Sequence, residues 1–198
     1  MFHRKPAAFG PAVAIVALAL LTIPAAAVGP EMAAPGWIVD PASSKLGYAG
    51  VGNSESFEGS FGKWSAEINF DPAHLDQSLA KVTIDTGSAS SGDPSRDDPL
   101  REASWFDIGA FPNATFTTHG ITSTGPDAYV ADGTLTIKGV SKPVKLPFTL
   151  TIDGDTARMK GEAQIDRKEW GLGEGSWQDK SVDPNVTVKV DITATRAS

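Results

Sequence analysis

Side chains that could carry out acid-base or metal chemistry are few in this sequence. Downstream of the first 27 residues the only histidines are His74 and His119, and the chain contains no cysteine. A metal site would therefore have to be built from carboxylates. Asp97 with Arg96 or His119 is one candidate acid-base pair, but no nucleophile motif, phosphate loop or paired-carboxylate spacing accompanies it. We therefore expect no catalytic residue, no metal and no cofactor.

Aromatic side chains give the main positive signal. Most of them fall on apolar strand faces or beside a short helical segment, where ordinary core packing would also place them. The alternative is that they surround a bound apolar ligand. The residues that we expect to contact such a ligand are Phe57, Phe61, Trp64, Ile68, Leu100, Trp105, Phe106, Phe116, Leu135, Ile137, Phe148, Met159, Gly161 and Trp170.

Small residues on the same faces favour the ligand-binding alternative. They are Gly59, Ala66, Ala131, Gly133, Gly161 and Ala163. An interior lined by glycine and alanine leaves apolar volume unfilled, and empty volume costs stability unless a ligand occupies it. We expect Gly161→Trp to fill this volume while the protein still folds.

Strands must position these residues, because the periodicity of the sequence is close to two. In segment 144–152, Val144, Leu146 and Phe148 alternate with Lys145, Pro147 and polar residues. Such segments have one apolar and one wet face. The expected strands cover 46–48, 57–61 continuing through 64–70, 82–84, 114–116, 129–137, 144–152, 157–165 and 186–194. A bulge near Gly62 would explain the change of phase between 57–61 and 64–70.

One helix interrupts the strands. Asp98 can cap it and Pro99 suits its first position, so we expect a short helix around 99–105. Arg96, Asp97 and Arg101 either solvate the start of this helix or line the mouth of a pocket. Arg167, next to Asp166 at a strand end, is expected to form a local ion pair that fixes the turn.

Eight antiparallel strands with one apolar face close best as a barrel, because closure removes exposed edges. We therefore predict an all-β fold, an eight-stranded antiparallel barrel with one short helix. A barrel of this size either fills itself with side chains or holds one small ligand.

The N-terminus predicts export from the cytoplasm. Arg4 and Lys5 precede an apolar run over 12–23, and Ala25-x-Ala27 fits cleavage before Val28, so residues 1–27 read as a signal peptide. Residues 28–36 are expected to form a flexible lead and residues 37–196 the barrel domain. Loss of Arg4 and Lys5 moves the net charge from −7 to −9. Nucleic acid is therefore not an expected partner.

Several segments together resemble the YceI-like family of periplasmic polyisoprenoid-binding proteins. They are Trp37-x-x-Asp40-x-x-x-Ser44, Phe57-x-Gly59-x-Phe61, Arg96-Asp97-x-x-Leu100-Arg101, Trp105-Phe106-Asp107, Phe111-Pro112-x-Ala114-x-Phe116, residues 133–144, and Ile165-Asp166-Arg167 with Trp170-Gly171. The resemblance runs from Trp37 to about residue 195. It implies a lipocalin-like barrel in the periplasm whose pore encloses a long isoprenoid or prenyl-quinone chain.

The expected function is thus a periplasmic carrier that sequesters such a lipid and catalyses nothing. We also expect transient contact with a membrane during loading, and the sequence leaves the oligomeric state open, a homodimer included. Two other functions stay open at this point. One is a small outer-membrane barrel, since alternation alone does not say which face points outward. The other is an enzyme that modifies an isoprenoid.

Overall fold

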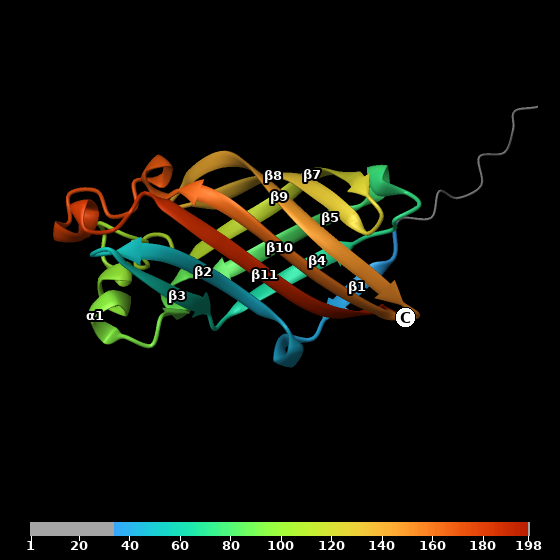
Figure 1. Cartoon of the computed structure of the whole chain (residues 1–198), viewed down its shortest axis with the longest axis horizontal. Coiled ribbons are helices and arrows are strands. Elements are labelled where there is room, and N and C mark those ends of the chain that lie inside the picture. Colours follow the sequence, from blue (N-terminus) through green and yellow to red (C-terminus); the bar gives the residue numbers. More distant parts are fainter. Residues whose placement is uncertain (1–33, 198) are drawn as a thin grey trace, which may run out of the picture. The chain divides into compact units, whose positions relative to one another are not determined.

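Antiparallel strands run obliquely around a closed barrel in the computed structural model, which describes residues 34–197 apart from the side chains of residues 177 and 178 (Figure 1). The strands are β1 (Gly36–Val39), β2 (Lys45–Gly52), β3 (Glu55–Phe61), β4 (Trp64–Asn69), β5 (Leu79–Asp85), β6 (Ala89–Ser90), β7 (Asn113–Gly125), β8 (Ala128–Ile137), β9 (Val140–Asp153), β10 (Thr156–Asp166) and β11 (Asn185–Arg196). The short helices are α1 (Pro94–Asp97) and the 3-10 turns η1 (Pro41–Ser43), η2 (Leu75–Gln77), η3 (Thr86–Ser88), η4 (Pro99–Arg101), η5 (Arg167–Trp170) and η6 (Trp177–Lys180).

The ring closes in the order β1-β4-β5-β7-β8-β9-β10-β11, with β11 pairing back onto β1. Strands β2, β3 and β6 continue β1, β4 and β5 around the same wall, because β11 pairs with β1 at one end and with β2 at the other. In the same way β3 lies between β2 and β6. The wall therefore consists of eight strands, three of them broken, and the predicted eight-stranded antiparallel barrel is confirmed.

The breaks in two neighbouring strands lie opposite each other. β3 ends at Phe61 and β4 begins at Trp64, so the predicted irregularity near Gly62 is present. The Gly62 amide donates to the Ser88 carbonyl at 3.1 Å, and the Lys63 amide donates to the Ser88 hydroxyl at 3.0 Å. Ser88 belongs to η3, which separates β5 from β6. The backbone groups released by one break are thus satisfied by the other.

The helix lies earlier than the sequence analysis placed it. Asp93 caps α1 by accepting from the Ser95 amide at 2.9 Å, and Pro94 occupies the first turn. The predicted helix around 99–105 is wrong, because that segment forms only the 3-10 turn η4, and Asp98 makes no side-chain cap there. Pro99 has no N–H and cannot extend α1. Within residues 34–197 no helix is long and apolar enough to cross a membrane.

The N-terminal boundary of the barrel lies before residue 37. Gly36 already belongs to β1 and pairs with Asn69, and the Pro35 carbonyl accepts from the Phe70 amide at 3.0 Å. Ala34 is buried. The end of the expected flexible lead is therefore part of the barrel, because β1 needs these residues to close the ring against β4. The expected signal peptide over 1–27, and residues 28–33, lie outside the described residues.

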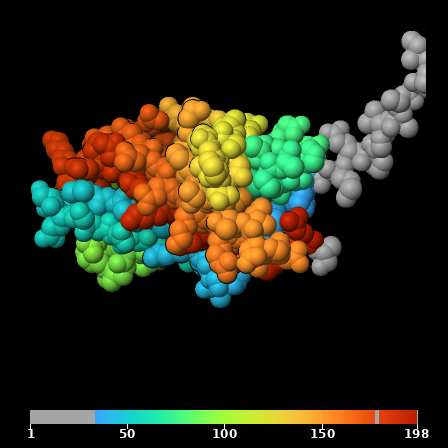
Figure 2. Space-filling model, turned by 45° about the vertical axis from the view of Figure 1, so that its right-hand side comes forward, coloured from blue at the N-terminus to red at the C-terminus, as the bar shows by residue number. Residues whose placement is uncertain are grey.

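Charged side chains lie on the outer face of the barrel. Lys160 pairs with Asp191 across β10 and β11 at 2.9 Å, and Lys189 pairs with Glu58 at 2.6 Å. The space-filling view shows part of this outer face, where residues of β8, β9 and β10 are coloured yellow to orange (Figure 2). A bilayer-spanning barrel needs an apolar outer band, and a lysine there costs about 2–4 kcal/mol near the midplane. These outward charges do not support the outer-membrane alternative.

Arg167 holds a loop over one end of the barrel. Its guanidinium group donates to four backbone carbonyls of the segment that follows η5. They belong to Leu172, Asp179, Val182 and Asp183. The side chain is 2% exposed, so only a planar group with several donors can satisfy these carbonyls at once.

The expected ion pair between Asp166 and Arg167 is not formed. Asp166 instead accepts from the Lys168 amide at 2.9 Å and so caps η5. The acidic partner of Arg167 is Asp179, at 3.6 Å. Asp166 ends β10 and Arg167 begins η5, and the two side chains take different partners.

Three inward glycines are covered by their neighbours rather than left open. A Cβ at Gly59 would collide with the Tyr48 ring, and a Cβ at Gly133 would lie 2.7 Å from the Thr117 carbonyl oxygen. A Cβ at Gly161 would lie 2.8 Å from the Pro147 carbonyl oxygen on β9. The expectation that the barrel tolerates Gly161→Trp is therefore wrong, because even a methyl group would force β9 and β10 apart.

We predict that Gly161→Ala lowers the free energy of unfolding by about 2 kcal/mol, the usual cost of overpacking a tight site. Gly120→Ala on β7 is the matched control, since nothing lies within 4 Å of its added Cβ. Urea unfolding of both variants measures the difference. Equal stabilities for the two variants would contradict the close contact at Gly161.

We predict that Arg167→Lys lowers the free energy of unfolding by about 3 kcal/mol, because an ammonium group leaves some of the buried carbonyls without donors. Arg158→Lys, an exposed change on β10, should stay within about 0.5 kcal/mol of the parent. Denaturant titration checks both. An Arg167→Lys variant as stable as the parent would show that the loop does not depend on the guanidinium group.

Candidate binding cavity

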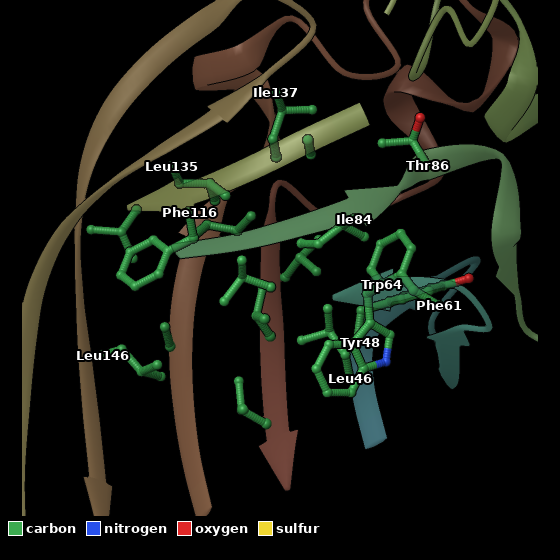
Figure 3. A pocket seen from close by; sticks show the side chains of 18 of the residues that line it. Leu46, Tyr48, Phe61, Trp64, Ile84, Thr86, Phe116, Leu135, Ile137 and Leu146 are labelled. Carbon is green, nitrogen blue, oxygen red and sulfur yellow. The ribbon is translucent and has the colours of Figure 1, made fainter. Parts of the chain in front are cut away.

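The barrel encloses a cavity of about 540 Å³, within the range of small-molecule sites. Inward side chains from both halves of the wall reach into it, including Leu46, Tyr48 and Trp64 on one side and Phe116, Leu135 and Leu146 on the other (Figure 3). Most of the lining is aliphatic or aromatic. The cavity can therefore hold an apolar chain mainly through non-directional contact.

Most of the predicted ligand-contact residues line this cavity. They are Phe57, Phe61, Trp64, Ile68, Leu100, Trp105, Phe106, Phe116, Leu135, Ile137, Phe148 and Met159. Their contact with a lipid stays a prediction. Most of them lie on strands, where the alternation in the sequence predicts which side chains point into the barrel; Leu100, Trp105 and Phe106 lie between β6 and β7.

Gly161 and Trp170 are the two predicted residues that do not line the cavity. Gly161 is shielded by Pro147 and Phe148 of β9. Trp170 is 2% exposed and belongs to η5, beyond the end of β10, where its indole N–H donates to the Leu135 carbonyl at 3.2 Å. Its ring packs the end of the barrel, so its function is structural.

The open space comes from alanines rather than glycines. The alanines that line the cavity are Ala66, Ala80, Ala114, Ala131, Ala157, Ala163 and Ala194. Inward residues such as Ile68, Met159 and Val190 are only partly buried, because part of their surface faces the cavity. A solid core would bury them completely. The expectation of unfilled interior volume is thus met, although Gly59, Gly133 and Gly161 do not create it.

The sequence analysis missed much of the aliphatic lining. The missed residues include Leu46, Val82, Ile84, Val144, Leu146, Val186, Val188 and Val190. They lie on the same alternating faces as the aromatic residues, so the period-two pattern could have identified them. The expected list gave most weight to aromatic residues and included only some of the aliphatic residues on these faces.

Polar residues gather at the end of the cavity near α1 and the β2–β3 hairpin. They are Asn53, Glu55, Ser91, Asp93, Ser95, Arg96 and Asp97, and we call this group the mouth. Arg96 and Asp97 therefore line the pocket mouth, one of the two roles considered for them. Arg101 is exposed and is not among the lining residues.

Asp97 is the buried carboxylate of the mouth, at 8% exposure. Its Oδ2 accepts from the Ser90 hydroxyl at 2.8 Å, and its Oδ1 accepts from the amide and the hydroxyl of Ser91 at 2.7 and 2.8 Å. Burial opposes the charged form, but these hydrogen bonds outweigh it and lower the pKa of Asp97. The carboxylate is therefore charged at neutral pH.

Tyr48 also lines the cavity, with a buried hydroxyl that has no hydrogen-bond partner among the described residues. Its ring lies across Gly59 and 5.4 Å from the ring of Phe61. Burial raises the pKa of Tyr48 to about 12, with the charge of Asp97 adding to the rise and Arg96 opposing it. Tyr48 is therefore neutral across the physiological range.

Arg96 is held at the mouth by three contacts. Its guanidinium group lies 5.8 Å above the centre of the Phe57 ring and 3.3 Å from the Asp93 carboxylate. Its Nε donates to the Ser91 hydroxyl at 3.3 Å. The cation at the mouth is thus already engaged with an acidic side chain.

The candidate acid-base pairs are not assembled around His119. His119 lies on the outer face of β7, where its Nε2 is 2.6 Å from the Thr134 hydroxyl. His74 contacts Asp71 at 2.9 Å in an exposed turn. Across residues 34–197, no three histidine, aspartate or glutamate side chains are grouped so that they could hold a metal ion.

Comparison with known sequences places the chain in a family. The sequence matches the YceI-like domain over residues 37–194. A UPF0312 protein from Azotobacter vinelandii is 32% identical over 136 residues, which are 65% of this chain and 67% of that one. A UPF0312 protein from Pectobacterium carotovorum is 37% identical over 120 residues, 58% of this chain and 62% of the relative. The match thus spans about three fifths to two thirds of these curated relatives.

Solved structures share the barrel. Burkholderia cenocepacia BcnA is 37% identical with a TM-score of 0.76, over 79% of this chain and 99% of that one. A domain from Saccharophagus degradans, described as polyisoprenoid-binding, has a TM-score of 0.66 over 82% of this chain and 99% of that one. It is 14% identical, so that likeness concerns the fold alone. Because the family match covers most of its length, the chain belongs to the YceI-like family.

Proposed function

We propose that this protein is a carrier that holds the apolar chain of an isoprenoid or prenyl-quinone lipid inside its barrel and catalyses no reaction. The enclosed apolar cavity with a polar mouth at one end is the observation that carries this proposal. An elongated apolar space with one polar end has the polarity pattern of a lipid with a small head group. The polyisoprenoid-binding description of the Saccharophagus degradans domain, which shares the fold, is consistent with it.

The energetics of transfer explain why such a carrier is useful. A prenyl chain of about forty carbons costs about 30 kcal/mol to expose to water, at about 0.8 kcal/mol per methylene. A bilayer and the barrel interior are both apolar, so moving the chain from one to the other changes the free energy little. Loading and release are then both feasible, as a carrier requires.

The site of action follows from the expected signal peptide. We propose that the protein is exported to the periplasm and loads its lipid during transient contact with a membrane. Formation of a homodimer also stays a prediction. The absence of an assembled acid-base pair at His119 is the reason that we prefer binding to catalysis.

We predict that Ala66→Trp reduces the lipid that co-purifies with the protein at least tenfold. Ala66 points into the cavity from β4 and is only partly buried there, so an indole ring at this position would occupy the volume of the chain. The readout is the lipid-to-protein ratio by mass spectrometry, together with a thermal melt that verifies folding.

Ser65→Trp is the matched control, because the neighbouring side chain on β4 is exposed on the outer face. It adds the same ring to the same strand and should leave the lipid content unchanged. If folded Ala66→Trp protein retained as much lipid as the Ser65→Trp control, the chain would not lie in the cavity.

A further inference from the structure

The charged residues that line the cavity are mainly acidic. Among the described lining residues the acidic ones are Glu55, Asp93 and Asp97, and the basic ones are Arg96 and Arg167. Arg96 is engaged with Asp93 at 3.3 Å, and Arg167 donates to four carbonyls. Both basic groups are thus occupied by the protein itself, and the lining carries a net negative charge.

Asp97 keeps its charge without a cation. Its hydrogen-bond donors are the neutral groups of Ser90 and Ser91, which stabilise the carboxylate but do not cancel its field. Beyond the mouth the lining is mostly apolar, and charges act over longer distances in such surroundings than in water. Glu55 adds a second negative charge on the β2–β3 hairpin.

We propose that the cavity selects lipids whose head group carries no negative charge, and that Asp97 and Glu55 set this selectivity. The inference rests on the proposed lipid-binding function and names the head-group chemistry. An anionic head group at the mouth would lose hydration and meet carboxylates without a spare basic partner. An uncharged hydroxyl or carbonyl head group meets no such repulsion, and the Asn53 amide at the mouth and the unpartnered Tyr48 hydroxyl in the lining offer it hydrogen bonds.

Two probes that share one chain isolate the head-group charge. Geranylgeraniol and geranylgeranyl monophosphate have the same hydrocarbon tail, and only the phosphate is anionic. Each competes with the neutral fluorophore N-phenyl-1-naphthylamine for delipidated protein, and the loss of fluorescence gives its affinity. We expect geranylgeraniol to bind at least tenfold more tightly than the phosphate, given the strength of charge repulsion in partly buried sites.

Three variants test the assigned residues. Asp97→Asn removes the charge and keeps an acceptor for the serine donors. Glu55→Gln removes the charge of an exposed side chain, where folding is not at risk. Each variant should lower the ratio of the two probe affinities, geranylgeraniol over the phosphate, on the order of fivefold. Glu67→Gln is the control, because it changes the net charge equally but lies exposed on β4, outside the cavity lining. The ratio of the two probe affinities should stay as in the parent.

The outcomes separate the two proposals. If both probes displace the fluorophore with equal affinity, charge selectivity is overturned and lipid binding stands. If neither probe displaces it, both proposals are overturned. If Glu67→Gln lowers the ratio of the two probe affinities as much as Asp97→Asn and Glu55→Gln do, the net charge of the protein rather than the mouth governs selectivity. The residue assignment is then overturned.

Discussion

Closure of the backbone hydrogen-bond ring around side chains too small to fill it is the constraint on which this structure depends. Eight strands must pair edge to edge, and β11 completes the ring by pairing with both β1 and β2. A ring of that size fixes the width of the interior. Alanines at inward positions such as Ala66 and Ala163 then leave apolar space that the wall cannot collapse to fill. The lipid chain of the proposed function would offset the cost of that space, which links the fold to that function.

The two ends of the barrel differ in chemistry. The end near β1 lies away from α1 (Figure 1). There Trp37 donates its indole N–H to the Phe70 carbonyl at 2.9 Å, and Tyr129 stacks on Phe148 with ring centres 5.3 Å apart. At the other end α1 brings Asp97 and the rest of the mouth to the cavity. An amphiphile bound in this interior would place its tail among the aromatic residues and its head group at the mouth. Its orientation is thus set by the polarity of the lining.

The sequence predicts the strands and the inward faces well, because a period of two is a local property that survives folding. It fails where the answer depends on a neighbouring strand. Asp93-Pro94 and Asp98-Pro99 both suit a helix start, and the structure begins α1 at the first, where Asp97 also accepts hydrogen bonds from Ser90 and Ser91. Gly161 seemed open because its cover, Pro147 on β9, is distant in sequence. The sequence also left open whether Arg96 and Asp97 solvate the helix start or line a pocket mouth, because the pocket forms only when strands distant in sequence close the barrel.

Native mass spectrometry of the protein, purified from its own host without detergent, tests the central claim most directly. We predict a discrete added mass that is lost on organic extraction and is identified as a prenyl lipid with an uncharged head group. The melting temperature should also fall when the lipid is removed, because ligand binding stabilises the folded state. A protein that carries only its own mass, and melts at the same temperature before and after extraction, would contradict the carrier function.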